Sequence, residues 1–193
     1  EVLPTDAIHL FSTNAEADNH NTLRMNQITT EEFLSDAFDL IKSESLSRDE
    51  RIRILNVVSN QMKPSDTQGL RYQLQLKTTA KYMMTVNINT SDGLVNGATG
   101  ILMEIEIYAE SRKPKTLWIF FSDESVGIEA RRQKPHATEA LWTPVETCLR
   151  TFQFKRNQQV TIERRQFPLV IAEGITIHKS QGLTFSRVVI DFT

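Results

Sequence analysis

The first part of the chain has a pattern typical of a strand that leads into a helix. Segment 6–11 is mostly apolar and runs into Ser12, Thr13 and Asn14, residue types that cap helix N-termini. Helix-forming residues follow in 15–25. These positions predict one β-α step.

Two further capping signals follow. Thr29–Glu32 precedes apolar residues that recur at helical spacing as far as residue 41, which predicts a helix, with a short strand as the alternative. Ser47–Glu50 is a clearer capping box before another run of apolar residues at helical spacing. We therefore expect an acidic, partly helical connector at 30–63.

From residue 70 the hydrophobic pattern repeats every two residues, as in β-strands. The dipeptides Asp92-Gly93 and Asn96-Gly97 are turn signals between short segments rich in β-forming residues. The predicted strands are 72–76, 82–88, 101–108, 117–121, 151–154 and 160–162, of which the last two form a hairpin. Such regularly spaced strands indicate a small β-barrel or sandwich.

After residue 165 the pattern returns to an α/β character. Segment 167–172 is a predicted strand, Thr176–Gly182 is a tight turn into a short helix, and 188–192 is an apolar strand of the buried parallel type. An α/β unit at each end is typical of a domain that carries an insertion. We expect α/β parts at 1–69, with the acidic connector, and at 166–193, around an inserted β-barrel at 70–165.

Composition narrows the class of protein. The 193 residues are 39% hydrophobic and 24% charged, which is the range of globular proteins. No apolar run approaches the ~20 residues of a membrane span, and the first residues lack the features of a signal peptide, so we expect a soluble, intracellular protein without a membrane partner. With Cys148 as the single cysteine and scattered histidines, we expect no disulfide and no metal site.

Charge is distributed unevenly along the chain. Residues 1–69 hold 6 Lys+Arg against 12 Asp+Glu, a net −6, whereas residues 70–193 hold 16 against 12, a net +4. A basic second part is a weak indication of a polyanionic partner, and an uneven solvated surface is the alternative.

The densest group of chemically useful side chains lies at 175–184. Thr176, His178, Lys179 and Ser180 gather where a predicted strand ends, before a glycine that permits positive φ. Hydroxyls, a cation and the backbone N–H groups of a helix start all donate to phosphate oxygens. The segment predicts a phosphate- or anion-binding turn, and a capped helix with a solvated polar face is the alternative.

Three ordered segments resemble Pif-type helicases of superfamily one, the relatives of bacterial RecD. Gln166–Gly182 resembles the fifth motif of that family, Phe11–Asn21 its fourth motif, and Gly93–Gly100 its Leu-Val-Asn-Gly segment. Lys81–Asn87 is similar to the Helitron-type transposon helicases. The resemblance implies an α/β fold: a RecA-like parallel sheet of the P-loop NTPase type without its own phosphate loop, interrupted by a small β-barrel of the Src-homology-three type.

The resemblance also implies a function. The chain would be the C-terminal motor part of an ATP-dependent 5′ to 3′ DNA helicase, in the nucleus of a eukaryote or in its mitochondrion. Its partners would be single-stranded DNA and the N-terminal motor domain of the same parent chain. ATP and Mg²⁺ would be held mainly by that other domain. The residues implied to contact the DNA backbone are Thr13, Asn14, Thr176, His178, Lys179 and Ser180.

Other residues implied by the resemblance have different roles. Gln181 and Gly182 would lie nearer the nucleotide, at the cleft between the motor domains. For Thr13 and Asn14, structural capping is the alternative to DNA contact. The interpretation requires Ile175–Gly182 to lie beside the opening strand and Asn14, on one edge of a single sheet.

Several features have structural interpretations. The bends of the barrel explain Asn96, Gly97 and Gly100, and a core position is favoured for Phe152 and Phe154 over a base-stacking role. The basic residues either rim a DNA channel or form a solvated edge that resists aggregation. They are Arg150, Lys155, Arg156, Arg164 and Arg165.

The catalytic site is expected to be incomplete. The sequence contains no Gly-x-x-x-x-Gly-Lys-Ser/Thr loop, and it ends before the last motif of the family, which carries an arginine for the γ-phosphate. Asp123-Glu124 looks like a Mg²⁺-binding acidic pair, but it follows no such loop, so a structural role is preferred. We expect no ATP hydrolysis by the isolated chain. A helicase-derived nucleic-acid-binding module and a peptide-binding interaction domain stay open as alternatives.

Overall fold

The computed structural model describes residues 7–43, 45–154, 160–182 and 187–190. None of the helices in these ranges is long and apolar enough to cross a membrane. The elements, in chain order, are β1 (Ile8–Phe11), α1 (Asn14–Gln27), β2 (Glu32–Asp36), β3 (Phe38–Ile41), α2 (Arg48–Gln61), the 3-10 helix η1 (Pro64–Thr67), β4 (Gln73–Lys77), β5 (Lys81–Met84), β6 (Thr99–Ile107), β7 (Pro114–Phe121), α3 (Ile128–Gln133), β8 (Trp142–Val145), β9 (Cys148–Phe154), β10 (Val160–Gln166), β11 (Leu169–Ile171), β12 (Gly174–Thr176), α4 (Ile177–Ser180) and β13 (Val188–Ile190).

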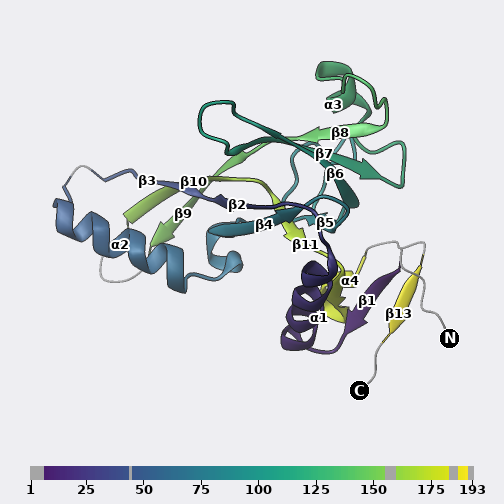
Figure 1. Cartoon of the computed structure of the whole chain (residues 1–193). Coiled ribbons are helices and arrows are strands. Elements are labelled where there is room, and N and C mark those ends of the chain that lie inside the picture. Colours follow the sequence, from purple (N-terminus) through teal and green to yellow (C-terminus); the bar gives the residue numbers. More distant parts are fainter. Residues whose placement is uncertain (1–6, 44, 155–159, 183–186, 191–193) are drawn as a thin grey trace.

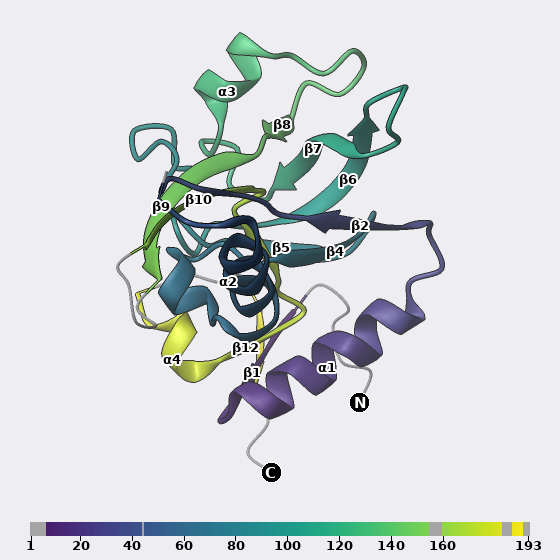
Figure 2. The same ribbon diagram turned by 90° about the vertical axis from the view of Figure 1, so that its left-hand side faces the viewer.

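A small parallel sheet brings together segments from both ends of the sequence. β1 lies at its centre, and β12 and β13 pair with it in parallel on either side. We call this sheet, with α1 and α4, the parallel unit. Figures 1 and 2 show it at the opposite end of the molecule from α3. The β-α step predicted at the start of the chain is confirmed, because β1 runs directly into α1.

The strands from β2 to β11 form antiparallel sheets, which we call the antiparallel part. A five-stranded sheet has the order β11-β5-β6-β7-β8, a three-stranded sheet has the order β3-β10-β9, and β2 pairs with β4. The main core of this part includes Met25 from α1, so the first helix packs against it. A second apolar cluster lies where Val58 of α2 meets Phe152 and Phe154 of β9, which confirms their predicted core position.

The strands predicted between 72 and 162 are confirmed in position, although β5 ends at Met84 and β8 was not predicted. The predicted hairpin is also confirmed, with Phe152 opposite Ile162 in the register of β9 and β10. The fold is therefore a mixed α/β arrangement with parallel and antiparallel sheets.

The helix predicted up to residue 41 is wrong, and the strand alternative is right. β2 and β3 pair with β4 and β10, which lie far along the sequence. Ser35 points inward and donates to Gln166 Oε1 at 2.9 Å, whereas Phe38 is 66% exposed. Distant pairing partners decided the conformation here, and local spacing carries no information about them. The second capping signal is confirmed, because Ser47 caps α2.

The last strands also differ in part from the predictions. β13 is parallel to β1 as predicted, but Val188 is 38% exposed and Ile190 is 49% exposed. The expectation of a buried strand is therefore wrong for the described residues of β13. β11, predicted at 167–172, is a strand that pairs antiparallel with β5 of the five-stranded sheet.

The two parts of the molecule are joined by polar and apolar contacts. Lys77 Nζ donates to the carbonyl oxygens of Met25 and Ile28 at 3.1 and 3.0 Å, which satisfies the C-terminal end of α1. The carboxylate of Glu173, just before β12, is buried and accepts from the Lys81 N–H at 2.9 Å. A small apolar cluster joins β1, β5 and β12 beside it. These contacts fix the parallel unit against the antiparallel part.

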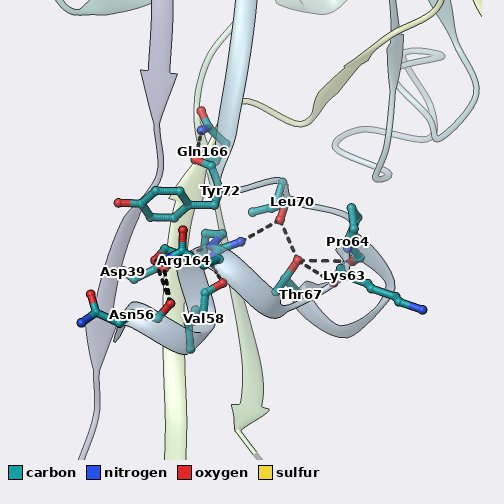
Figure 3. Close-up of polar contacts among 12 residues, drawn as sticks. Asp39, Asn56, Val58, Lys63, Pro64, Thr67, Leu70, Tyr72, Arg164 and Gln166 are labelled. Carbon is teal, nitrogen blue, oxygen red and sulfur yellow. Dashed lines mark hydrogen bonds and ion pairs between the residues drawn. The ribbon is translucent and has the colours of Figure 1, made fainter. Parts of the chain in front are cut away.

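Arg164 contradicts both roles predicted for the basic residues. Its side chain is 1% exposed, and its Nε and Nη2 each donate to one carboxylate oxygen of Asp39 at 2.7 Å (Figure 3). Its Nη1 donates to the Leu70 carbonyl at 3.0 Å, and its guanidinium lies 5.5 Å from the ring centroids of both Tyr72 and Phe152. Arg164 is neither a DNA rim residue nor a solvated edge, because this geometry uses the guanidinium inside the protein.

Candidate nucleic-acid interface

The carboxyl ends of β1 and β12 meet at one edge of the parallel sheet. Phe11 lies opposite Thr176 in the register, so the segments that follow these two residues leave the sheet side by side. α1 begins at Asn14 and α4 begins at Ile177. The required juxtaposition of Ile175–Gly182 with the opening strand is confirmed. In α/β folds, ligands bind outside the carboxyl ends of parallel strands.

Thr13 has a structural role at this edge. Its Oγ1 accepts from the Glu16 N–H at 3.2 Å, and Glu16 Oε2 accepts from the Thr13 N–H and the Ser12 hydroxyl, each at 2.9 Å. The hydrogen bonds from Ser12 and then Thr13 lower the pKa of the Glu16 carboxyl. The capping alternative for Thr13 is therefore confirmed as one of its roles, while Thr13 and Asn14 both stay exposed at the edge.

Asn21 of α1 holds the start of β12. Its Oδ1 accepts from the Gly174 N–H at 2.7 Å, and its Nδ2 donates to the Gly174 carbonyl at 2.9 Å. A Cβ at Gly174 would lie 2.7 Å from the Phe11 ring and 3.0 Å from His20, so only glycine fits there without a shift. The position of the fifth-motif segment therefore depends on a side chain of the fourth-motif segment.

The four candidate residues at α4 are not equally accessible. Thr176 precedes the helix and is only 4% exposed, so its side chain is covered in this structure. His178 and Lys179 are exposed, and the Ser180 hydroxyl donates within the helix to the Ile177 carbonyl at 2.7 Å. The side chains most open to a ligand are therefore His178 and Lys179.

Gln181 and Gly182 end this segment and are exposed, with a positive φ of 76° at Gly182. They lie at different grooves: Gln181 lines one with His178 and Lys179, and Gly182 lines another with Ile8 and Arg187. A Cβ at Gly182 would meet nothing within 4 Å.

Known proteins of one family share this arrangement. The ATP-dependent DNA helicase PIF1 of Xenopus laevis is 31% identical over 121 residues, which cover 63% of this chain and 16% of that protein. The crystal structure of the Pif1 helicase from Candida albicans matches 97% of this chain and 40% of that chain, with a TM-score of 0.62 and 23% identity. The chain is similar in sequence and in fold to Pif1-family ATP-dependent DNA helicases.

The chain spans less than half the length of each of these relatives. Bacteroides Pif1 in complex with ADP-AlF3 and single-stranded DNA has a TM-score of 0.56 and 19% identity, over 100% of this chain and 36% of that chain. No protein-family model matches the sequence. The likeness to this family thus rests on individual Pif1 helicases.

The Leu-Val-Asn-Gly segment of the chain is built from turns. Gly97 has a φ of 97° and donates to the Met84 carbonyl at 2.9 Å, while a Cβ at Gly100 would lie 2.5 Å from an Ile119 side-chain carbon. Asn96 donates its backbone N–H to Asn87 Oδ1 at 2.8 Å. These contacts agree with the predicted architectural role of Asn96, Gly97 and Gly100.

The remaining candidates lie elsewhere. Asp123 follows an antiparallel strand and accepts from the Ser125 N–H and hydroxyl at 2.9 and 2.6 Å, which agrees with a structural role. Arg150 donates to the Asn87 carbonyl at 3.0 Å, and Arg165 is exposed on β10. Lys155 and Arg156 lie outside the described residues.

Sequence reasoning missed two residues near this edge. Asn21 was predicted only to be the last residue of the fourth-motif segment, without a role of its own. An amide in a helix that follows a strand can nevertheless be a partner for a neighbouring backbone. Arg71 was not singled out, yet it lines the same groove as His178, Lys179 and Gln181. Its position between the predicted connector and the first β-strand gave no local sign of this proximity.

Proposed function

We propose that the chain is the part of an ATP-dependent DNA helicase that grips single-stranded DNA. The observation that carries the proposal is the shared edge of β1 and β12, where Asn14, His178 and Lys179 are exposed together. Polar side chains at the carboxyl edge of a parallel sheet suit phosphate oxygens. The Bacteroides relative complexed with single-stranded DNA supports this ligand.

The grip we propose is independent of base sequence. His178 and Lys179 would donate to backbone phosphates, with Asn14 and Thr13 contacting the strand from the start of α1. Ser180 belongs to the same set, although its hydroxyl is engaged within α4. Thr176 would contribute through its backbone, because its side chain is buried. Phosphate contacts carry no sequence information.

We also infer the finer classification of the two parts. The parallel order β12-β1-β13 supports a RecA-like second motor domain, and the antiparallel sheets support an inserted barrel of the Src-homology-three type. Because β2 and β3 pair with β4 and β10, the pairings support borders of the insertion near residues 28 and 172 in place of 69 and 165. Similarity to Helitron-type helicases stays a prediction from Lys81–Asn87.

For the whole protein we infer a 5′ to 3′ motor with a second grip in another domain. ATP and Mg²⁺ would be held mainly there, and Gln181 and Gly182 would face that cleft. The part contributed by this chain is to hold one stretch of the strand while the other domain moves. Without a phosphate loop in its sequence, the isolated chain is expected not to hydrolyse ATP.

The proposal is tested by the binding of a fluorescein-labelled oligothymidylate, followed by fluorescence anisotropy in a salt series. We expect weak binding whose logarithm falls linearly with the logarithm of salt concentration, by about 0.7 per phosphate contacted. Lys179→Glu combined with His178→Ala should abolish it. The matched control is Arg132→Glu, the same charge reversal at an exposed site on α3.

Unchanged binding in the Lys179→Glu, His178→Ala variant would remove α4 from the DNA path. Salt-sensitive binding by a chain whose parent gene encodes no upstream phosphate loop would favour the nucleic-acid-binding module without ATPase activity. A chain with no affinity for oligonucleotides would favour the peptide-binding interaction domain.

A further inference from the structure

Two adjoining grooves run between the parallel unit and the antiparallel part. The first, of about 320 Å³, is lined by residues of α1, β4 and β12, and the second, of about 440 Å³, by residues around η1, the 96–97 turn and α4. Four residues line both: Arg71, Met83, Val170 and Lys179. The shared residues make the grooves one continuous path from α1 to the 96–97 turn.

The charged side chains of this path are mostly positive. Arg71 comes from the antiparallel part and Lys179 from the parallel unit, and neither has a hydrogen bond or ion pair with another described residue. Among the described lining residues, Asp18 is the one carboxylate, and it belongs to the first groove alone. Two such cations, one from each part of the molecule, suit an anionic ligand.

The backbone on both sides of Arg71 is fixed by buried groups. The Leu70 carbonyl accepts from Arg164 Nη1 at 3.0 Å, and the Tyr72 carbonyl accepts from Gln166 Nε2 at 3.1 Å (Figure 3). Both Arg164 and Gln166 are 1% exposed. The buried ion pair thus supports the segment that presents Arg71, and a site supported in this way loses little entropy when a ligand binds.

The shape and lining favour a polymer backbone over a base or a small anion. The volume of the path is larger than one phosphate needs, and its described lining contains no Phe, Tyr or Trp on which a base could stack. The second groove of the path lies beside the edge of β1 and β12, because His178, Lys179 and Gln181 line it.

We propose that Arg71 is a second phosphate-binding residue and that it holds the strand of single-stranded DNA in this groove from the side opposite Lys179. The inference rests on the proposed function and extends it to the antiparallel part. Arg71 and Lys179 contact the backbone from two units that the Glu173 and Lys77 contacts keep at a fixed separation.

The test measures binding of the labelled oligothymidylate to the whole chain by fluorescence anisotropy. Arg71→Ala should weaken binding about fivefold, as expected for the loss of one partly screened charge-assisted contact, and should lower the salt slope by about 0.7. Arg71→Lys should recover most of the affinity, because it keeps the charge. Arg132→Ala on α3, with the same loss of charge, should bind like the parent chain.

Each outcome decides the inference. If Arg71→Ala binds like the parent while the Lys179→Glu, His178→Ala variant does not, Arg71 lies outside the path and the proposed function stands. If both variants bind like the parent, the proposed function fails as well. An Arg71→Lys variant as weak as Arg71→Ala, or displacement of DNA by poly-glutamate at equal charge, would also overturn the assignment to a DNA strand.

Discussion

At the scale of single residues, Arg164 and Asp39 lie directly opposite each other on β10 and β3, with side chains 1% and 4% exposed. Removing two charges from water costs several kcal/mol per ion, and good geometry must offset that cost. Here two hydrogen bonds of 2.7 Å and the Leu70 carbonyl satisfy the guanidinium. Loss of one partner would leave a buried charge without compensation.

Asp39→Ala should therefore lower the free energy of unfolding by about 3–5 kcal/mol, measured by urea denaturation. A matched control lies nearby, between Glu163 of β10 and Lys42, the residue after β3. Lys42 and Glu163 form an ion pair of 3.1 Å whose side chains are 46% and 25% exposed, so Lys42→Ala should cost less than about 1 kcal/mol. Equal, small effects of the two substitutions would show that the buried pair does not stabilise the fold.

Part of this arrangement could be predicted from the sequence. Val160, Ile162, Arg164 and Gln166 alternate along β10 and all four are buried, so a strict reading of the period-two pattern places Arg164 inward. Its partner Asp39 is 125 positions away in the sequence. Nothing local connects the two, and an arginine on a predicted hairpin was therefore assigned to the surface.

At the scale of elements, α1 and β12 are linked by one side chain across 153 positions of sequence. The Asn21 amide satisfies both the N–H and the carbonyl of the buried Gly174. A backbone group left buried without a partner costs about 1–3 kcal/mol. The position of β12, and with it the start of α4, should thus depend on Asn21.

Asn21→Leu should destabilise the chain by about 2–4 kcal/mol and, in hydrogen exchange, reduce protection of the amides in β12 more than in the five-stranded sheet. Asn19→Leu is the control, because Asn19 is exposed on the same helix. Uniform loss of protection throughout the molecule would contradict the local role and leave only a general effect on stability.

α1 and α2 were predicted well from local signals, whereas the local signal before β2 and β3 was misleading. Capping boxes at Thr13 and Ser47 mark the starts of α1 and α2, because the hydrogen bonds that define them span three residues. β2 and β3 are strands only through β4 and β10. The same reasoning explains the site: its motifs were visible in the sequence, whereas the groove with Arg71 required the fold.

At the scale of the whole molecule, the chain places two segments from opposite ends of the sequence on one edge and sets the antiparallel part against them. β1 pairs with β12 although the whole antiparallel part lies between them in the sequence, so the edge depends on the complete fold. Because this edge lies beside the grooves, we propose that single-stranded DNA runs along it, between the parallel unit and the antiparallel part.

The most direct test of that claim maps the backbone amide resonances of the isotope-labelled chain while an oligothymidylate is added. If the strand follows this path, we expect changes in amide chemical shift concentrated at residues 12–14, 177–181 and 69–71, and no changes in α2 and α3. Shifts confined to α3 or to the solvent side of α2, with the edge of β1 and β12 unaffected, would contradict it.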